Sequence, residues 1–182
     1  MDSRPRLCVI TGLPGSGKTT VADILRPRLP NGWIVLRGDD FIGVTQACYP
    51  GRPWEEIRRL LPFFVGWAAG GYLEAQRGVL VEGHFRDAEE IDRLVQGARD
   101  LCQSCGPAAV VRLEGDPAKF AQRLANNPMR IPELRDPGRE RKILAWLGIC
   151  ALDPGLPGVR IDVGDLIEEA LALKVAAALG LR

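Results

Sequence analysis

The segment from Thr11 to Thr20 reads TGLPGSGKTT and follows the apolar run at 7–10. Its residues from Gly12 to Thr19 match the phosphate-loop pattern GxxxxGK[ST]. Such a loop requires glycines because the backbone wraps around a phosphate and turns its N–H groups inward, where side chains would collide. The pattern also demands a buried strand before the loop and a helix N-terminus after it. An ordinary glycine turn is the alternative, but the complete pattern in this context favours nucleotide binding.

The phosphate loop offers a binding group for each part of a nucleoside triphosphate. The Lys18 ammonium can reach the β- and γ-phosphates, and the Thr19 hydroxyl can bind Mg²⁺. We therefore expect ATP and Mg²⁺ as cofactors. The expected nucleotide-binding residues are Gly12, Pro14, Gly15, Ser16, Gly17, Lys18, Thr19 and Thr20.

Short apolar runs alternate with longer helical patterns along the chain, as expected for strands that are buried on both faces of a parallel sheet. Asp116 followed by Pro117 is a helix-start signal, because the aspartate can cap free N–H groups and proline suits the first turn. We therefore expect an α/β fold in which helices flank a five-stranded parallel sheet. The sequence predicts strands at 7–11, 33–37, 79–82, 109–113 and 159–163. It predicts helices at about 17–28, 55–76, 88–102, 117–126, 139–147 and 165–179.

The composition indicates one domain, over residues 1–182, because a chain that is 46% hydrophobic can bury a core at this length. Its 24 basic and 23 acidic side chains nearly cancel, so no overall field holds it on nucleic acid or on a membrane surface. No apolar run reaches the roughly 18 residues of a membrane span. A strand that begins by Leu7 leaves no room for a signal peptide. We expect a cytoplasmic protein without a nucleic-acid or membrane partner.

Five cysteines, an odd number without a framework spacing, fit a reducing compartment better than a disulfide scaffold. Cys102 and Cys105 form a CxxC pair, but no second Cys or His pair lies nearby, and the helix-stop residues Gly106 and Pro107 follow. We expect these cysteines to be structural, with zinc binding or redox chemistry as the alternatives.

The end of the predicted third strand distinguishes among the classes of phosphate-loop protein. It reads VLVEGH, whereas an ATPase machine would end such a strand in Asp-Glu, and the guanine motif NKxD of GTPases is absent from the chain. A kinase is therefore favoured. A kinase needs a base for the acceptor hydroxyl and cations that neutralise the phosphoryl group in transfer.

Two carboxylates, Asp39 and Asp40, follow the predicted second strand. They lie at the carboxyl end of that strand, where open α/β sheets bind their ligands. Asp39 is the predicted base, with contact to Mg²⁺ as a second duty. Asp40 either contacts the acceptor or caps the next helix.

Three segments, GLPGSGKTT at the loop, GDDF after the second strand and VEGHFR after the third, resemble the P-loop kinases that include chloramphenicol phosphotransferase, zeta toxins and polynucleotide 5′-kinase. The resemblance implies a three-layer P-loop fold, a kinase that uses ATP with Mg²⁺, and Asp39 as the base. Glu82 and Arg86 look like the zeta-toxin element that helps to hold the acceptor. His84, between them, either contacts the acceptor hydroxyl or makes a local hydrogen bond. Ile42 stands where zeta toxins and polynucleotide kinase place an arginine, which argues against a phosphorylated acceptor.

The arginine-rich stretch at about 126–140 corresponds, by the same resemblance, to a lid that closes over the phosphates and excludes water. Arg123 and Arg130 match the family's cations. Asn127 stands where chloramphenicol phosphotransferase has a middle lid arginine, so either Arg130 acts alone or Arg135 or Arg139 substitutes. The acceptor pocket is expected to be lined by residues 43–72. In that segment the helical spacing of Leu60, Phe64, Trp67 and Gly71 predicts that these residues face inward.

The sequence as a whole predicts a kinase that transfers the γ-phosphoryl group of ATP to a hydroxyl of a small molecule of the antibiotic, sugar or nucleoside type. Two alternatives stay open. One is a kinase of nucleic-acid 5′-hydroxyls, and the other is a nucleotide-binding switch or toxin-like regulator whose loop senses ATP.

Overall fold

The computed structural model describes residues 6–126, 139–164 and 166–181. Within these residues, five parallel strands form one sheet in the order β2-β3-β1-β4-β5. The strands are β1 (Leu7–Gly12), β2 (Ile34–Arg37), β3 (Val79–Glu82), β4 (Ala109–Glu114) and β5 (Val159–Asp162). The α-helices are α1 (Lys18–Leu25), α2 (Ile42–Cys48), α3 (Trp54–Glu74), α4 (Ala88–Leu101), α5 (Pro117–Ala125), α6 (Arg139–Ile149) and α7 (Glu168–Leu179). Short 3-10 segments, Arg26–Arg28 and Gly38–Phe41, follow α1 and β2.

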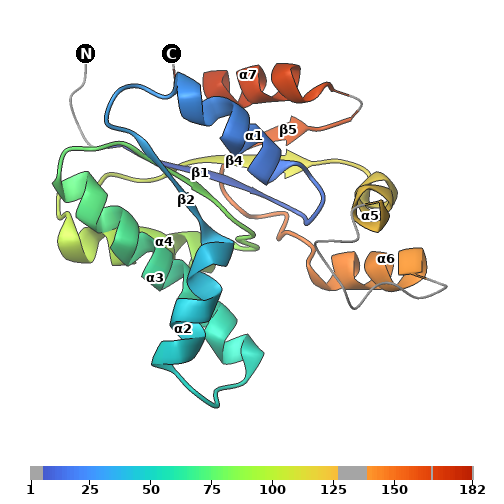
Figure 1. The fold of residues 1–182 in the computed structure, drawn as a ribbon, viewed down its shortest axis with the longest axis horizontal. Coiled ribbons are helices and arrows are strands. Elements are labelled where there is room, and N and C mark those ends of the chain that lie inside the picture. Colours follow the sequence, from blue (N-terminus) through green and yellow to red (C-terminus); the bar gives the residue numbers. More distant parts are fainter. Residues whose placement is uncertain (1–5, 127–138, 165, 182) are drawn as a thin grey trace.

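Helices cover both faces of the sheet, with α3 and α4 on one face and α1 and α7 on the other (Figure 1). Side chains of the central strand β1 alternate between the two faces. Cys8 and Ile10 belong to the buried cluster that includes α1 and α7, whereas Leu7 and Val9 belong to the cluster with α3 and α4. The predicted α/β fold with three layers is confirmed.

All five predicted strands are present, with bounds within one residue of the prediction. Asp116 caps α5 as predicted, because its carboxylate accepts a hydrogen bond from the Ala118 N–H at 2.8 Å. Two helix bounds differ by about three residues. The helix α1 ends at Leu25, since Pro27 has no N–H with which to continue the helical ladder, and α7 begins at Glu168.

The helix α2 is missing from the sequence prediction. It is only seven residues long, too short to show a helical period, and it contains the weak helix formers Gly43 and Thr45. Thr45 donates a hydrogen bond from its hydroxyl to the Phe41 carbonyl at 2.8 Å. The residue at the N-cap of α2 is Phe41, and no side chain caps this helix or the 3-10 segment before it. The alternative that Asp40 caps the next helix is therefore wrong.

The long helix α3 packs against α4 through glycines. A Cβ atom built on Gly66 would overlap the carbonyl oxygen of Leu94, and one on Gly97 would overlap the carbonyl oxygen of Phe63. Only glycine permits the two backbones to approach this closely. The buried apolar side chains on α3 are Ile57, Pro62, Val65, Ala69 and Leu73.

This close contact determines which face of α3 is buried. The prediction that Trp67 and Gly71 face inward is wrong, since Trp67 is 51% exposed and Gly71 is also exposed. Leu60 and Phe64 are only half-buried. The apolar spacing located a helix correctly, but the glycines set its rotation about its own axis.

We expect Gly66→Ala to lower the free energy of unfolding by about 2 kcal/mol, because the added methyl group has no space between α3 and α4. Gly71→Ala on the same helix is the matched control, since its Cβ would meet only Leu101 Cδ1, at 3.9 Å. That variant should be neutral or more stable by up to about 1 kcal/mol. Urea denaturation measures both. Equal effects of the two substitutions would contradict the packing argument.

The cysteines of the CxxC pair lie in the protein core. Cys102 and Cys105 are both buried and both thiols are free. They belong to the apolar cluster between the sheet and α4, and Cys105 donates from its thiol to the Gly106 carbonyl at 3.4 Å. Their position agrees with the expected structural role. No helix in the described ranges is both long enough and apolar enough to cross a membrane.

Candidate active site

The phosphate loop connects the end of β1 to the start of α1. Gly15 and Gly17 have φ values of +82° and +91°, in the left-handed region that glycine adopts without strain. A Cβ atom on Gly15 would also lie 2.8 Å from the Phe120 carbonyl oxygen. Gly17 is the N-cap residue of α1, and no side chain caps that helix. The first N–H groups of α1 are therefore left open to an anion.

Lys18 holds the loop together from the first turn of α1. Its ammonium donates to the carbonyls of Gly12 and Leu13 at 2.9 and 3.0 Å. Ser16 is fully buried, and its hydroxyl has no hydrogen-bond partner among the described residues. A buried hydroxyl of this kind requires a polar partner. The open N–H groups and the Ser16 hydroxyl both fit the phosphates of a nucleotide.

Three oxygen-bearing side chains meet beside this loop. The Thr19 hydroxyl donates to Glu82 Oε1 at 3.2 Å, and Glu82 is buried at the end of β3. Burial raises the pKa of Glu82; the Lys18 charge and the Thr19 hydrogen bond lower it, while the nearby Asp39 carboxylate raises it. Hydroxyl and carboxylate oxygens are the ligands that Mg²⁺ prefers. The residues present therefore fit Mg²⁺ next to the phosphates.

These groups share one cavity of about 470 Å³. It contains most of the predicted site residues, including Asp39, Asp40, Glu82 and His84, and it extends to Trp54 within the predicted segment 43–72. The complete lining is Pro14, Gly15, Gly17, Lys18, Thr19, Arg37, Asp39, Asp40, Ile42, Trp54, Glu82, Gly83, His84, Leu124 and Trp146. Arg37, Leu124 and Trp146 were not predicted. Arg37 is the last residue of β2, so its place at the strand end was a usable signal, whereas Leu124 and Trp146 carry no local signal.

Comparison with known proteins agrees with this geometry. Residues 8–143 match the family model described as AAA domain. The chain belongs to this AAA domain family. This chain is also 26% identical, over 131 residues, to the adenylate kinase of Pyrobaculum aerophilum. That match covers 69% of this chain and 66% of the adenylate kinase.

Two solved structures share the fold of this AAA domain. A gluconokinase from Sinorhizobium meliloti superposes with a TM-score of 0.64 at 19% identity, over 97% of this chain and 92% of that one. A tunicamycin resistance protein of Deinococcus radiodurans gives a TM-score of 0.64 at 22% identity, over 98% of each chain. The expected P-loop kinase fold is confirmed, and P-loop kinases use ATP with Mg²⁺.

Arg86 of this AAA domain lies outside the cavity lining. Its backbone N–H donates to the Glu90 carboxylate at 2.7 Å, and its guanidinium donates to the Ile149 carbonyl at 3.5 Å. Arg58 of α3 also pairs with the buried Glu90. The structure thus places Arg86 in a network that joins α3, α4 and the end of α6, and its contact with the acceptor stays a prediction.

Arg123 lies on the exposed face of α5, with its guanidinium 5.9 Å from the centroid of the Phe120 ring. It is not among the residues that line the cavity. Arg130, Arg135 and nearly all of the expected lid at 126–140 lie outside the described residues. The roles of Arg123 and Arg130 stay predictions.

His84 makes the local hydrogen bond that the sequence analysis considered, because its Nε2 lies 2.8 Å from the Cys150 carbonyl oxygen. The ring also lines the cavity. Burial lowers the pKa of His84 from 6.5 to about 4. The ring is therefore neutral near pH 7, and a neutral ring that donates through Nε2 keeps Nδ1 as an acceptor.

Acid is expected to destabilise the wild type more than His84→Gln. As the pH falls from 6.5 towards 4, the unfolded chain binds a proton at this position that the folded chain does not bind. The free energy of unfolding therefore falls through that window, whereas above it this group has no effect. Urea denaturation of both proteins at about pH 7 and about pH 4.5 measures the difference. Parallel losses in the two proteins would contradict the prediction.

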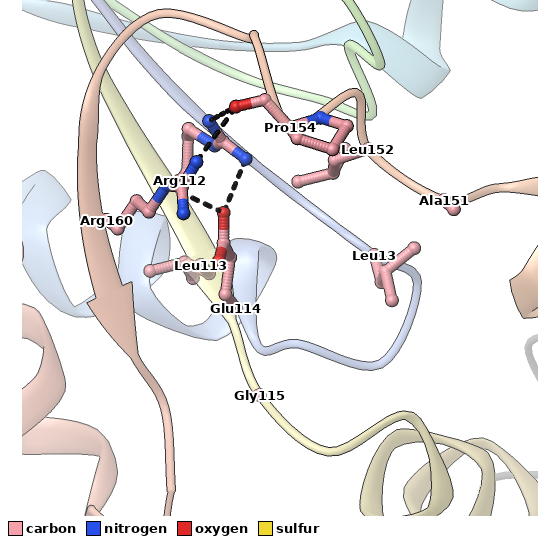
Figure 2. Close-up of a pocket in the computed structure, with 9 residues that line it drawn as sticks. All are labelled: Leu13, Arg112, Leu113, Glu114, Gly115, Ala151, Leu152, Pro154 and Arg160. Carbon is pink, nitrogen blue, oxygen red and sulfur yellow. Dashed lines mark hydrogen bonds and ion pairs between the residues drawn. The ribbon is translucent and has the colours of Figure 1, made fainter.

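A second cavity, of about 270 Å³, lies behind the phosphate loop, between Leu13 and the chain segment 151–154 (Figure 2). Arg112 of β4 is buried there and donates to the carbonyls of Pro154 and Leu156. Its guanidinium also pairs with Glu114 at 2.6 Å. Figure 2 shows the contacts of Arg112 with Pro154 and Glu114 on the wall opposite Leu13. Arg112 thus holds the segment 153–156 through hydrogen bonds to its carbonyls. This contact was not predicted from the sequence.

Proposed function

We propose that this chain is an ATP-dependent kinase that transfers the γ-phosphoryl group to a hydroxyl of a small molecule. The observation that carries the proposal is the shared cavity, in which the phosphate loop and the Asp39 carboxylate line the same space. A phosphate-binding loop beside an exposed carboxylate brings a phosphoryl donor and a base to one place.

The residues of the cavity divide the work of transfer. The loop N–H groups and Lys18 bind the phosphates and stabilise the charge that develops during transfer. Thr19 and Asp39 would hold Mg²⁺, which when bound neutralises phosphate charge. Asp39 accepts the proton of the acceptor hydroxyl while the hydroxyl oxygen forms a bond to the γ-phosphorus. The bond from that phosphorus to the bridging oxygen breaks, and ADP leaves.

The acceptor end of the cavity favours a hydroxyl over a phosphate as the accepting group. The described lining of the whole cavity contains two cations, Lys18 and Arg37. Lys18 belongs to the phosphate loop, and Arg37 pairs with Asp23 at 2.6 Å. Ile42, where related kinases of phosphorylated acceptors place an arginine, lines the cavity as an apolar residue. A phosphate acceptor would need cations that the described lining of this cavity does not supply.

A screen for phosphoryl transfer from Mg²⁺-ATP tests the proposal. The panel comprises sugars, amino sugars, nucleosides, hydroxyl-bearing antibiotics, 5′-hydroxyl oligonucleotides and AMP, with products identified by mass spectrometry. We expect a phosphate ester of one small-molecule class. Conversion of AMP to ADP would show a phosphate acceptor instead. Tight ATP binding without transfer to any compound would contradict a kinase and favour the nucleotide-binding switch.

A further inference from the structure

The carboxylate of Asp40 lies in the cavity wall and does not stabilise the fold through any contact with the described residues. It is exposed, it lines the cavity, and it caps neither the 3-10 segment nor α2. Its side chain makes no hydrogen bond or ion pair with another residue of the ranges that the structure describes. An exposed carboxylate with no partner beside a phosphate loop is available to a ligand.

The charged side chains near Asp40 in the cavity already have other partners. Asp39 and Glu82 lie with Thr19 beside the phosphate loop, and Arg37 pairs with Asp23 at 2.6 Å and lies 4.0 Å from Glu82. Three carboxylates and two cations line the described cavity, and one of those cations, Lys18, serves the phosphates. Among the described residues of the cavity lining, the unmatched charge is therefore negative.

Two tryptophans complete the same cavity. Trp54, at the start of α3, is 47% exposed, and Trp146, on α6, is 38% exposed. Indole rings bind the C–H faces of sugars and also attract ammonium groups, because the ring face carries partial negative charge. A carboxylate together with two indoles suits a ligand that combines hydroxyls with a positive charge.

We propose that the phosphoryl acceptor is a polyhydroxy compound with a protonated amine, and that Asp40 binds its ammonium group. This inference rests on the proposed function and deepens it, because it assigns the charge of the acceptor. Asp39 accepts the proton of the hydroxyl, and Asp40 binds the ammonium group. Trp54 and Trp146 contact the apolar faces of the ligand.

Matched acceptors that differ only in charge test the proposal. Each amine, namely glucosamine, kanamycin and an aminonucleoside, is assayed beside its N-acetylated form, with glucose, gluconate and AMP as neutral and anionic compounds. We expect kcat/KM to be about tenfold higher for an amine than for its N-acetylated form, with a preference that weakens as salt is added. Quenching of tryptophan fluorescence measures the binding of the same pairs directly.

Asp40→Asn is expected to remove that tenfold preference by raising KM for the amine, while the matched control Asp100→Asn, on the exposed face of α4, retains it. Circular dichroism shows whether both variants fold. Transfer to neutral or anionic acceptors in preference to amines would overturn the assignment of charge and leave the proposed kinase intact. Absence of transfer to every compound would overturn both.

Discussion

Lys18→Met is expected to lower the rate of phosphoryl transfer about 1,000-fold. Methionine keeps the length of the side chain but removes the charge that stabilises the phosphoryl group as it moves. It also removes the two hydrogen bonds from the ammonium to the carbonyls of Gly12 and Leu13, at 2.9 and 3.0 Å, which hold the loop in shape. The loss of charge should lower kcat, and the loss of the two hydrogen bonds should also weaken ATP binding.

The control for this substitution is Lys174→Met, on an exposed position of α7. It removes the same charge outside the cavity lining and should leave transfer unchanged. Initial rates with saturating acceptor, together with ATP binding by calorimetry, separate the two effects of Lys18→Met. Transfer by Lys18→Met at more than a tenth of the wild-type rate would refute its assigned role.

Asp39→Asn is expected to lower kcat about 1,000-fold while ATP still binds. Asparagine has nearly the same shape as aspartate but cannot accept the proton of the acceptor hydroxyl. Asp39 is exposed at the end of β2 and does not cap the helix that follows, so the substitution should cost little stability. The expected signature is a protein that folds, binds nucleotide and fails at the chemical step.

Single-turnover rates with bound ATP measure that step, and Asp100→Asn again provides the matched control. Glu82 is the carboxylate nearest in role, because it lies in the same cavity and its pKa is raised by burial. If Asp39→Asn keeps the wild-type rate and Glu82→Gln loses it, the base is Glu82 and the assignment made here is wrong.

The sequence predicted the sheet well because its central strands, β1, β3 and β4, are buried on both faces. Such strands must be apolar at consecutive positions, and the run from Leu7 to Ile10 meets this requirement without reference to the rest of the molecule. The phosphate loop was predictable for a similar reason, since the backbone of such a loop locally requires glycines. Asp39 and Glu82 could be placed because both follow strands, and parallel strands end at one edge of the sheet.

Features that depend on tertiary contacts were not predictable. Trp146 reaches the cavity from α6, far along the chain from Asp39, and nothing in its neighbours indicates this. Arg112 is buried in the middle of β4 because the segment at 153–156 supplies carbonyl acceptors. The rotation of α3 follows from glycines on two helices, which a period read along one helix does not reveal.

The two buried clusters lie on either side of the sheet, and the acceptor end of the cavity belongs to neither. Asp40, Trp54 and Trp146 are all exposed and contribute nothing to those clusters. Substitutions at such positions remove little buried apolar area, so they change stability little. A lineage with this architecture can therefore exchange one acceptor for another by altering a few surface side chains, while the sheet and the phosphate loop are inherited unchanged.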